Sequence, residues 1–196
     1  MKTKVIGLTG GIAAGKTMVS NYLLKRGYSV IDADVMTHYL YGISEIRDAI
    51  ISEFGSEAYD EKGNFNRDYV GSVVFSNPNK RHALNEIMHP AVRKKSESLI
   101  SELQGILFLD AALLFTGKLD SLCEMVCYVK ADREKRLVRL MERSDLTEEE
   151  ANRMIDSQKE EEALAEACTV RVDIYNDSDL NELYQRVDRL LERITV

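Results

Sequence analysis

The chain has 196 residues, of which 44% are hydrophobic and 30% charged, so it can bury one compact core and is not expected to be disordered. Its net charge of −7, from 26 basic and 33 acidic residues, argues against a general nucleic-acid binder but permits a local basic pocket for a small anion. An odd count of three cysteines indicates a reducing environment, and no stretch reads as a membrane span or a leader. We therefore expect a cytoplasmic protein without a nucleic-acid or membrane partner.

Five short apolar runs predict β-strands, at residues 4–9, 28–32, within 105–115, 124–131 and 172–176. Such nearly continuous apolar runs are typical of strands that are covered on both faces. Helical spacing of apolar residues between the runs predicts helices at 17–26, 44–54, 77–103, 147–158 and 179–194. The alternation of strands and helices indicates an α/β fold with a parallel, doubly wound sheet.

Local signals refine the helices. Ser44 is expected as an N-cap, and Thr147 and Glu150 have the spacing of a capping box. Pro90 should bend or break the third helix, and the residue before it, His89, should be kept out of helical geometry. Apolar stripes are expected on the first helix and on the last, at Met18, Val19, Tyr22 and Leu23, and at Leu180, Leu183, Val187, Leu190, Leu191 and Ile194.

The predicted strands are unevenly spaced along the chain. About 70 mainly helical residues separate the second strand from the third, which is too long for one crossover, so they should form a lobe. We expect one domain over residues 1–196, with a core at about 1–34, 104–131 and 169–196. The helical lobe then spans about 35–103, and a charged helical lid spans about 132–168.

The segment GGIAAGKT fits the phosphate-loop pattern G-x-x-x-x-G-K-[ST] between a strand and a helix. Backbone N–H groups of such a loop and the following helix N-terminus surround a phosphate, and the lysine reaches the β- and γ-phosphates. The hydroxyl of Thr17 is expected to bind Mg²⁺. The fold should therefore be a three-layer P-loop NTPase fold with a five-stranded sheet. The expected ATP-binding residues here are Gly10, Gly11, Ala13, Ala14, Gly15, Lys16, Thr17 and Met18.

Three aspartates follow predicted strands, where ligands of doubly wound sheets bind. Asp32 is a candidate for holding Mg²⁺, and Asp34 for accepting a proton from the acceptor hydroxyl, with an N-cap as its alternative role. Asp110 ends the apolar run ILFL and is either a second metal-site carboxylate or an ordinary turn residue. No N-K-x-D guanine-reading segment follows, so a GTPase switch is rejected.

Arginines recur at positions 133, 136, 139 and 143, on one face of a predicted helix. They are either a solvated, ion-paired face or part of a lid that clamps transferring phosphates. We favour the lid for Arg139 and Arg143. In the lobe, His89 and Arg93 are candidates for contact with an anionic acceptor.

Together these segments resemble the dephospho-coenzyme A kinase family over nearly the whole chain. The resemblance rests on IGLTGGIAAGKT, VIDADVMTH, GNFNRDYVGSVVFSNP, LNEIMHPAVRK, LDAALLFTGKLD and RLMERSDLTEEEANRMIDSQ. It implies transfer of the γ-phosphoryl group of ATP to the ribose 3′-hydroxyl of dephospho-CoA, the last step of coenzyme A synthesis, with Mg²⁺.

The resemblance also implies roles for individual residues. Asp34, Lys16 and Arg143 are the catalytic candidates, and Asp34, His89 and Arg93 the acceptor-binding ones. Arg139, Arg143 and Asn176 join the ATP site, with Asn176 near the adenine. Thr17, Asp32 and Asp110 are the metal candidates.

The sequence also departs from the family pattern. The family usually shows P-L-L-F-E, whereas here Ala112 and Thr116 stand at the first and last positions. A basic residue often comes after Gln158, whereas here Lys159 precedes Glu160, Glu161 and Glu162, and the stretch before Asn176 is longer than usual. The alternatives are another small-metabolite or nucleoside monophosphate kinase, and a regulatory nucleotide-binding protein without turnover. The oligomeric state is open, with a monomer favoured.

Overall fold

A computed structural model describes residues 3–195 of the chain. The chain divides into two compact units, the first made of Met1–Ile31 and Ile100–Val196 and the second of Asp32–Leu99. The second unit runs from residue 32 to residue 99, whereas the expected helical lobe runs from about 35 to 103. The two units are described separately below.

The first unit is built on a parallel sheet, which has five strands among the described residues. These are β1 (Lys4–Gly10), β2 (Ser29–Asp32), β3 (Ile106–Asp110), β4 (Met125–Lys130) and β5 (Arg171–Tyr175), in the order β2-β3-β1-β4-β5. In the register, Leu8 on the central strand lies opposite Asp110 on one side and Cys127 on the other. All five predicted strands are confirmed, as is the P-loop fold with its parallel sheet.

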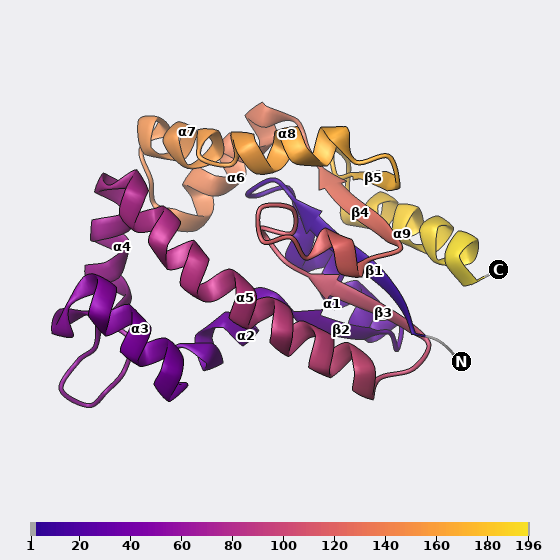
Figure 1. Cartoon of the computed structure of the whole chain (residues 1–196). Coiled ribbons are helices and arrows are strands. Elements are labelled where there is room, and N and C mark those ends of the chain that lie inside the picture. Colours follow the sequence, from indigo (N-terminus) through magenta and orange to yellow (C-terminus); the bar gives the residue numbers. More distant parts are fainter. Residues whose placement is uncertain (1–2, 196) are drawn as a thin grey trace. The chain divides into compact units, whose positions relative to one another are not determined.

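Helices α1 (Lys16–Lys25) and α9 (Leu180–Thr195) contribute to one hydrophobic core with the sheet (Figure 1). This core contains Ile6 and Leu8 of β1, Val19 and Leu23 of α1, and most of the predicted stripe of α9. Two predicted stripe residues lie outside it, because Met18 and Leu180 are each 41% exposed. Both belong to the first turn of a helix, where few neighbouring turns are available to cover a side chain.

Three helices occupy the expected lid region: α6 (Arg133–Ser144), α7 (Glu148–Asp156) and α8 (Lys159–Ala167). The predicted capping box is present, since the N–H of Glu150 donates to Thr147 Oγ1 and the N–H of Thr147 donates to Glu150 Oε2. Leu140, Ala151 and Ile155 form a small separate core between α6 and α7. The lid region therefore has a hydrophobic centre of its own.

The second unit is helical, with α2 (Ala33–Leu40), α3 (Ser44–Phe54), α4 (Arg67–Ser76) and most of α5 (Pro78–Glu102). Short 3₁₀ turns lie at Ser56–Ala58 here and at Asp120–Leu122 in the first unit. The N-cap expected at Ser44 is wrong, because Ile43 is the cap residue and Ser44 begins the helix. A helix can start there because the N–H groups of a first turn need no intrahelical acceptor.

Of the bend or break expected at Pro90, a break is not found, because α5 runs continuously through this residue. The non-helical geometry expected for His89 is wrong, because His89 is helical. Proline removes only its own N–H bond, to the carbonyl of the residue four before it, and crowds that carbonyl. The turns on both sides keep their bonds, and Met88, Val92 and Ser96 are buried along the helix. Packing of these residues outweighs the local preference of the residue before proline.

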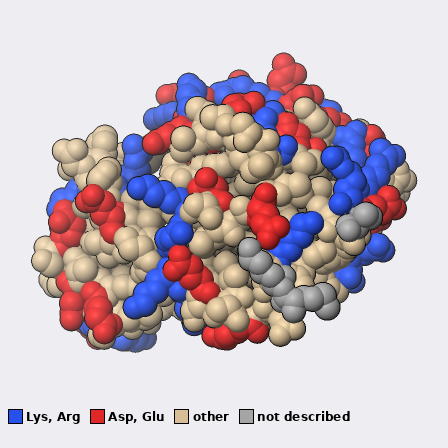
Figure 2. Space-filling model, turned by 45° about the vertical axis from the view of Figure 1, so that its right-hand side comes forward, with Lys and Arg blue, Asp and Glu red and all other residues tan. Residues whose placement is uncertain are grey.

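On the face shown in Figure 2, basic and acidic side chains are interspersed. None of the helices in the described part of the chain is both long and apolar enough to cross a membrane.

Candidate nucleotide-binding site

The phosphate loop joins the buried strand β1 to α1 in a shape that only small residues permit. Gly15 is the N-cap of α1 with φ of 103°, and Ala13 also has a positive φ of 59°. At Gly10, a Cβ would lie 2.5 Å from the carbonyl oxygen of Val129. The loop backbone therefore packs directly against β4 before it enters α1.

The N-terminus of α1 is left open for an anion. No side chain caps it, and its first turn contains no acidic residue. The N–H groups of a first helical turn have no intrahelical acceptors, and the helix dipole adds positive potential at this end. This is the arrangement that binds phosphate groups in nucleotide-binding proteins.

Lys16 and Asp110, predicted from separate motifs, lie together. Lys16 Nζ donates to Asp110 Oδ1, and the carboxylate of Asp110 is almost fully buried, with Asp110 2% exposed. The register places Asp110 opposite Leu8 at the end of β3, and the N–H of Ala111 donates to the Leu8 carbonyl at 3.0 Å. The strand end thus holds a carboxylate that fixes the loop lysine near the start of α1.

Asn176 links the loop to the lid region. Its Nδ2 donates to the Ala14 carbonyl at 2.8 Å, and its own carbonyl accepts from the Arg139 guanidinium at 2.9 Å. A Cβ at Gly15 would overlap the Asn176 amide, so this contact needs glycine there. Three residues predicted for the ATP site, Ala14, Arg139 and Asn176, are therefore joined by hydrogen bonds.

Other candidates of the first unit lie at the surface. Thr17 and Met18 are exposed in the first turn of α1, and Arg143 is exposed in the last turn of α6. Their side chains are accessible to a ligand. Their roles stay predictions.

In the second unit, Asp32 and Asp34 differ in local role. Asp32 caps α2, since its Oδ1 accepts from the N–H of Val35 at 2.8 Å, so the cap considered for Asp34 is formed by Asp32 instead. Asp34 is exposed in the first turn, and its carbonyl contacts His38 Nδ1 at 2.8 Å. Arg67 contacts the other ring nitrogen of His38. Arg67 stands in the quoted motif GNFNRDYV but had no predicted role.

His89 and Arg93 lie one helical turn apart on α5, which places them on the same face of the helix. Arg93 Nε is 3.0 Å from Glu97 Oε1, and both predicted residues are half-buried. The structure thus brings these two acceptor candidates together, although not through the non-helical backbone that Pro90 suggested.

The expected metal donors are oxygen atoms. Thr17 offers an exposed hydroxyl, and Asp110 and Asp32 offer carboxylates. Residues 3–195 contain no group of three or more His, Cys, Asp or Glu side chains arranged to hold a metal ion. Mg²⁺ in proteins commonly takes one or two carboxylates and completes its shell with water and substrate phosphate, so the oxygen donors Thr17 and Asp110 of the first unit fit it. The carboxylate of Asp32, in the second unit, is a donor of the same chemical type.

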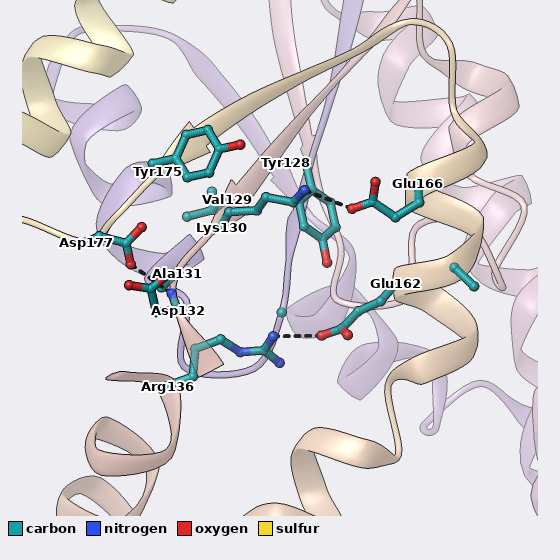
Figure 3. Close-up of a pocket in the computed structure, with 12 residues that line it drawn as sticks. Tyr128, Val129, Lys130, Ala131, Asp132, Arg136, Glu162, Glu166, Tyr175 and Asp177 are labelled. Atoms are coloured by element: carbon teal, nitrogen blue, oxygen red, sulfur yellow. Dashed lines mark hydrogen bonds and ion pairs between the residues drawn. The ribbon is translucent and has the colours of Figure 1, made fainter. Parts of the chain in front are cut away.

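A cavity of about 300 Å³ lies beside the phosphate loop, between the ends of β4 and β5 and helix α8. Among its lining residues, Lys130 pairs with Glu166 at 2.8 Å and Arg136 with Glu162 at 2.8 Å. Figure 3 marks both pairs with dashed lines. Hydrogen bonds from Arg171 and Lys130 lower the pKa of Glu166 to about 2, and burial raises the pKa of Tyr128 to about 12. The cavity wall therefore includes two ion pairs among its other lining residues.

Three residues of the lid region contact the core although none was predicted as a site residue. They are Arg136, Gln158 and Glu161. Arg136 belongs to the recognised arginine series, but periodicity could not tell which arginine faces inward. Burial decides it, because Arg136 is 8% exposed whereas Arg133 and Arg143 are exposed.

Comparison with known proteins decides the family. A family model of dephospho-CoA kinase matches residues 4–182. The chain belongs to the dephospho-CoA kinase family.

Curated relatives agree with this assignment. The dephospho-CoA kinase of Fusobacterium nucleatum is 36% identical over 99% of this chain and 100% of its own length. That of Bacillus cereus is 40% identical over 97% of this chain and 96% of its own length. Among solved structures, a Thermus thermophilus protein superposes with a TM-score of 0.81 at 27% identity and covers 100% of both chains. The predicted family is therefore confirmed, and the alternatives are not favoured.

Proposed function

We propose that this protein transfers the γ-phosphoryl group of ATP to the ribose 3′-hydroxyl of dephospho-CoA, giving coenzyme A and ADP. The observation that carries the proposal is the open N-terminus of α1 beside the Lys16–Asp110 pair, in a chain of the dephospho-CoA kinase family. The reaction takes place in the cytoplasm, and the partners are ATP and dephospho-CoA.

On the donor side, the backbone N–H groups of residues 13–17 bind the β- and γ-phosphates, and Lys16 moves from Asp110 to the phosphate oxygens. Support comes from the uncapped first turn of α1, which favours negative charge. Arg139 donates to the carbonyl of Asn176 and can reach the end of the loop that Asn176 contacts. The exposed Arg143 adds a second guanidinium when the lid residues approach the phosphates. These cations stabilise charge that spreads over the phosphoryl group during transfer.

Thr17, Asp110 and Asp32 would hold Mg²⁺, which would neutralise negative charge on the phosphates during transfer. In the described structure Asp110 engages Lys16, so its carboxylate already serves as the electrostatic anchor of the loop. Release of Lys16 toward the phosphates frees a carboxylate oxygen of Asp110.

On the acceptor side, Asp34 accepts the proton of the 3′-hydroxyl, and His89 and Arg93 bind the anionic groups of dephospho-CoA. Support for Asp34 is its exposed position two residues beyond the end of β2, with its carboxylate not used as the helix cap. Support for the other two is their common face on α5. A carboxylate base needs no further activation when charge development on the hydroxyl oxygen is small, as in loose phosphoryl transfer.

The test is a product assay with purified protein, ATP and MgCl₂ over a panel of acceptors: dephospho-CoA, adenosine, AMP and CMP. We expect coenzyme A and ADP in equal amounts from dephospho-CoA, with the new phosphate on the 3′ position by ³¹P NMR. Turnover of AMP or CMP without turnover of dephospho-CoA would support a nucleoside monophosphate kinase instead. Nucleotide binding without transfer to any acceptor would support a regulatory protein.

Two variants test the roles of the residues. Asp34→Asn should lower kcat by about 100-fold or more with little change in ATP affinity, because general-base catalysis contributes on this order. Lys16→Met should weaken both nucleotide binding and turnover. An unchanged kcat in Asp34→Asn would remove Asp34 as the base.

A further inference from the structure

Within the phosphate loop, both backbone polar groups of one residue, Ile12, are bonded to side chains of the lid region. The N–H of Ile12 donates to Gln158 Oε1 at 2.5 Å, and the carbonyl of Ile12 accepts from Arg136 Nε at 2.9 Å. Gln158 is the N-cap of α8 and Arg136 belongs to α6, and both lie more than a hundred residues from Ile12 along the chain. The two peptide units that flank the Cα of Ile12 are therefore each fixed by a residue outside the loop.

The side chain of Ile12 is fixed as well. Ile12 and Ala13 pack against the small hydrophobic core of Leu140, Ala151 and Ile155. This core belongs to α6 and α7, so two residues of the phosphate loop are part of the hydrophobic centre of the lid region.

Arg136 is itself held in place before it contacts the loop. It is nearly buried, and its NH1 donates to Glu162 of α8 at 2.8 Å (Figure 3). A Cβ at Gly11 would lie 2.5 Å from the Arg136 guanidinium carbon, so the guanidinium lies flat against the loop backbone at a glycine. The loop sequence and the position of Arg136 fit each other.

We propose that Arg136 and Gln158 are positioning residues that hold the phosphate loop in its phosphate-binding shape before a nucleotide arrives. A loop without these contacts would populate several backbone conformations, and nucleotide binding would have to select one of them. The entropic cost of ordering would then appear as weaker binding. The lid region thus acts on ATP through the loop backbone, independently of any contact of Arg139 or Arg143 with phosphate.

This role predicts a particular kinetic signature. The contacts are made equally in the ground state and the transition state, so their loss should raise KM for ATP and leave kcat nearly unchanged. Gln158→Met keeps the size of the side chain, removes the acceptor and alters no charge. We expect it to raise both KM and the dissociation constant for ATP about three- to tenfold, the range of one hydrogen bond. KM for dephospho-CoA should stay within about twofold.

Arg136→Met is the second variant, and Arg133→Ala and Lys159→Ala are the matched controls. Arg133 lies one turn before Arg136 on α6 and pairs with Asp156, whereas Lys159 follows Gln158 and is exposed. Both controls remove a positive charge from the same region without touching Ile12. Binding is measured with a fluorescent ATP analogue, because the chain contains no tryptophan, and thermal melting monitors folding of each variant.

The double variant Gln158→Met/Arg136→Met tests whether the two side chains act together on Ile12 or independently of each other. Because both side chains hold the backbone of the same residue, Ile12, the combined effect on ATP affinity should be smaller than the product of the two single effects. Direct nucleotide binding tests the inference even if dephospho-CoA is not the acceptor, so its failure differs from failure of the proposed function. An ATP dissociation constant unchanged in folded Gln158→Met, or changed equally in the two controls, would overturn it.

Discussion

Replacement of Glu161 by alanine should lower the stability of the protein much more than replacement of an exposed glutamate on the same helix would. Glu161 is 4% exposed, and its two carboxylate oxygens accept from the N–H groups of Phe115 at 2.8 Å and Thr116 at 2.9 Å. The first of these N–H groups is buried and the second partly buried. The carboxylate therefore ties α8 to the segment that follows Asp110.

The magnitude follows from the two lost hydrogen bonds. A buried donor left without its acceptor costs about 1–3 kcal/mol, and the partly buried donor of Thr116 stands at the lower end because water can replace the carboxylate. Removal of the charge also relieves its own desolvation, so we expect a net loss of about 3 kcal/mol. In a protein of this size, that corresponds to a fall in Tm of about 6–12 °C. Glu161→Gln keeps one acceptor and should lose about half as much.

Differential scanning calorimetry of Glu161→Ala, Glu161→Gln and Glu160→Ala is the assay. Glu160 is the matched control, since it is the preceding residue of the same helix and its side chain is exposed. The control should melt within about 2 °C of the parent, as surface substitutions usually do. If Glu161→Ala melted with the control, the carboxylate would not be bonded as described and the reasoning would fail.

Three further predictions concern other parts of the first unit. Gly15→Ala should abolish detectable nucleotide binding, because its Cβ would overlap the Asn176 amide at a backbone φ of 103°; a binding titration within tenfold of the parent would contradict this. Glu166→Gln should be less stable than the parent by a constant margin above about pH 5, and the margin should vanish as pH falls toward about 2, because a carboxylate with a lowered pKa stabilises only while ionised. If the difference in unfolding free energy between Glu166→Gln and the parent persisted to pH 2 in urea titrations, the lowered pKa of Glu166 would be refuted. Burial raises the pKa of the Cys127 thiol, so a thiol reagent should label it only upon unfolding, whereas labelling of the native protein at the rate of an exposed cysteine would show that the core around it opens.

The sheet and the phosphate loop could be predicted from the sequence because their signals are local. Each strand is a short apolar run, and the loop is defined by glycines at fixed spacing before Lys16. The pairing of Lys16 with Asp110 follows from topology, since β1 and β3 are neighbours and their carboxyl ends meet at one edge of the sheet. Local pattern therefore predicts the strands and the loop, whereas the pairing of Lys16 with Asp110 depends on the strand order, which our predictions from the sequence did not include.

Other contacts could not be predicted because tertiary packing decides them. The α-helical geometry of His89 is one example, since the preference of a residue before proline is weaker than the packing along α5. The contact of Arg136 with Ile12 is another. A series of arginines three and four residues apart shows that they share a helix face, but not which of them points inward or what it contacts.

Two departures from the family pattern, noted separately in the sequence, meet in the structure. Thr116 stands where the resemblance leads us to expect a glutamate, and Glu161 lies in an acidic run where it leads us to expect a basic residue. In the fold, the carboxylate of Glu161 accepts from the N–H of Thr116 itself. A carboxylate is therefore still present beside residue 116, although α8 supplies it.

The contacts of Glu161 have a consequence for the lid region. The N-terminal part of α8 and the residue before it make three contacts with their surroundings: Gln158 with Ile12, Glu161 with Phe115 and Thr116, and Glu162 with Arg136. Movement of α8 would have to break all three together, whereas the exposed Arg143 at the end of α6 lies outside this set. If the lid moves when ATP binds, the motion should therefore be largest around residues 143–150 and smallest at α8. Hydrogen exchange with and without ATP should show protection changing at residues 143–150 while α8 stays protected in both states.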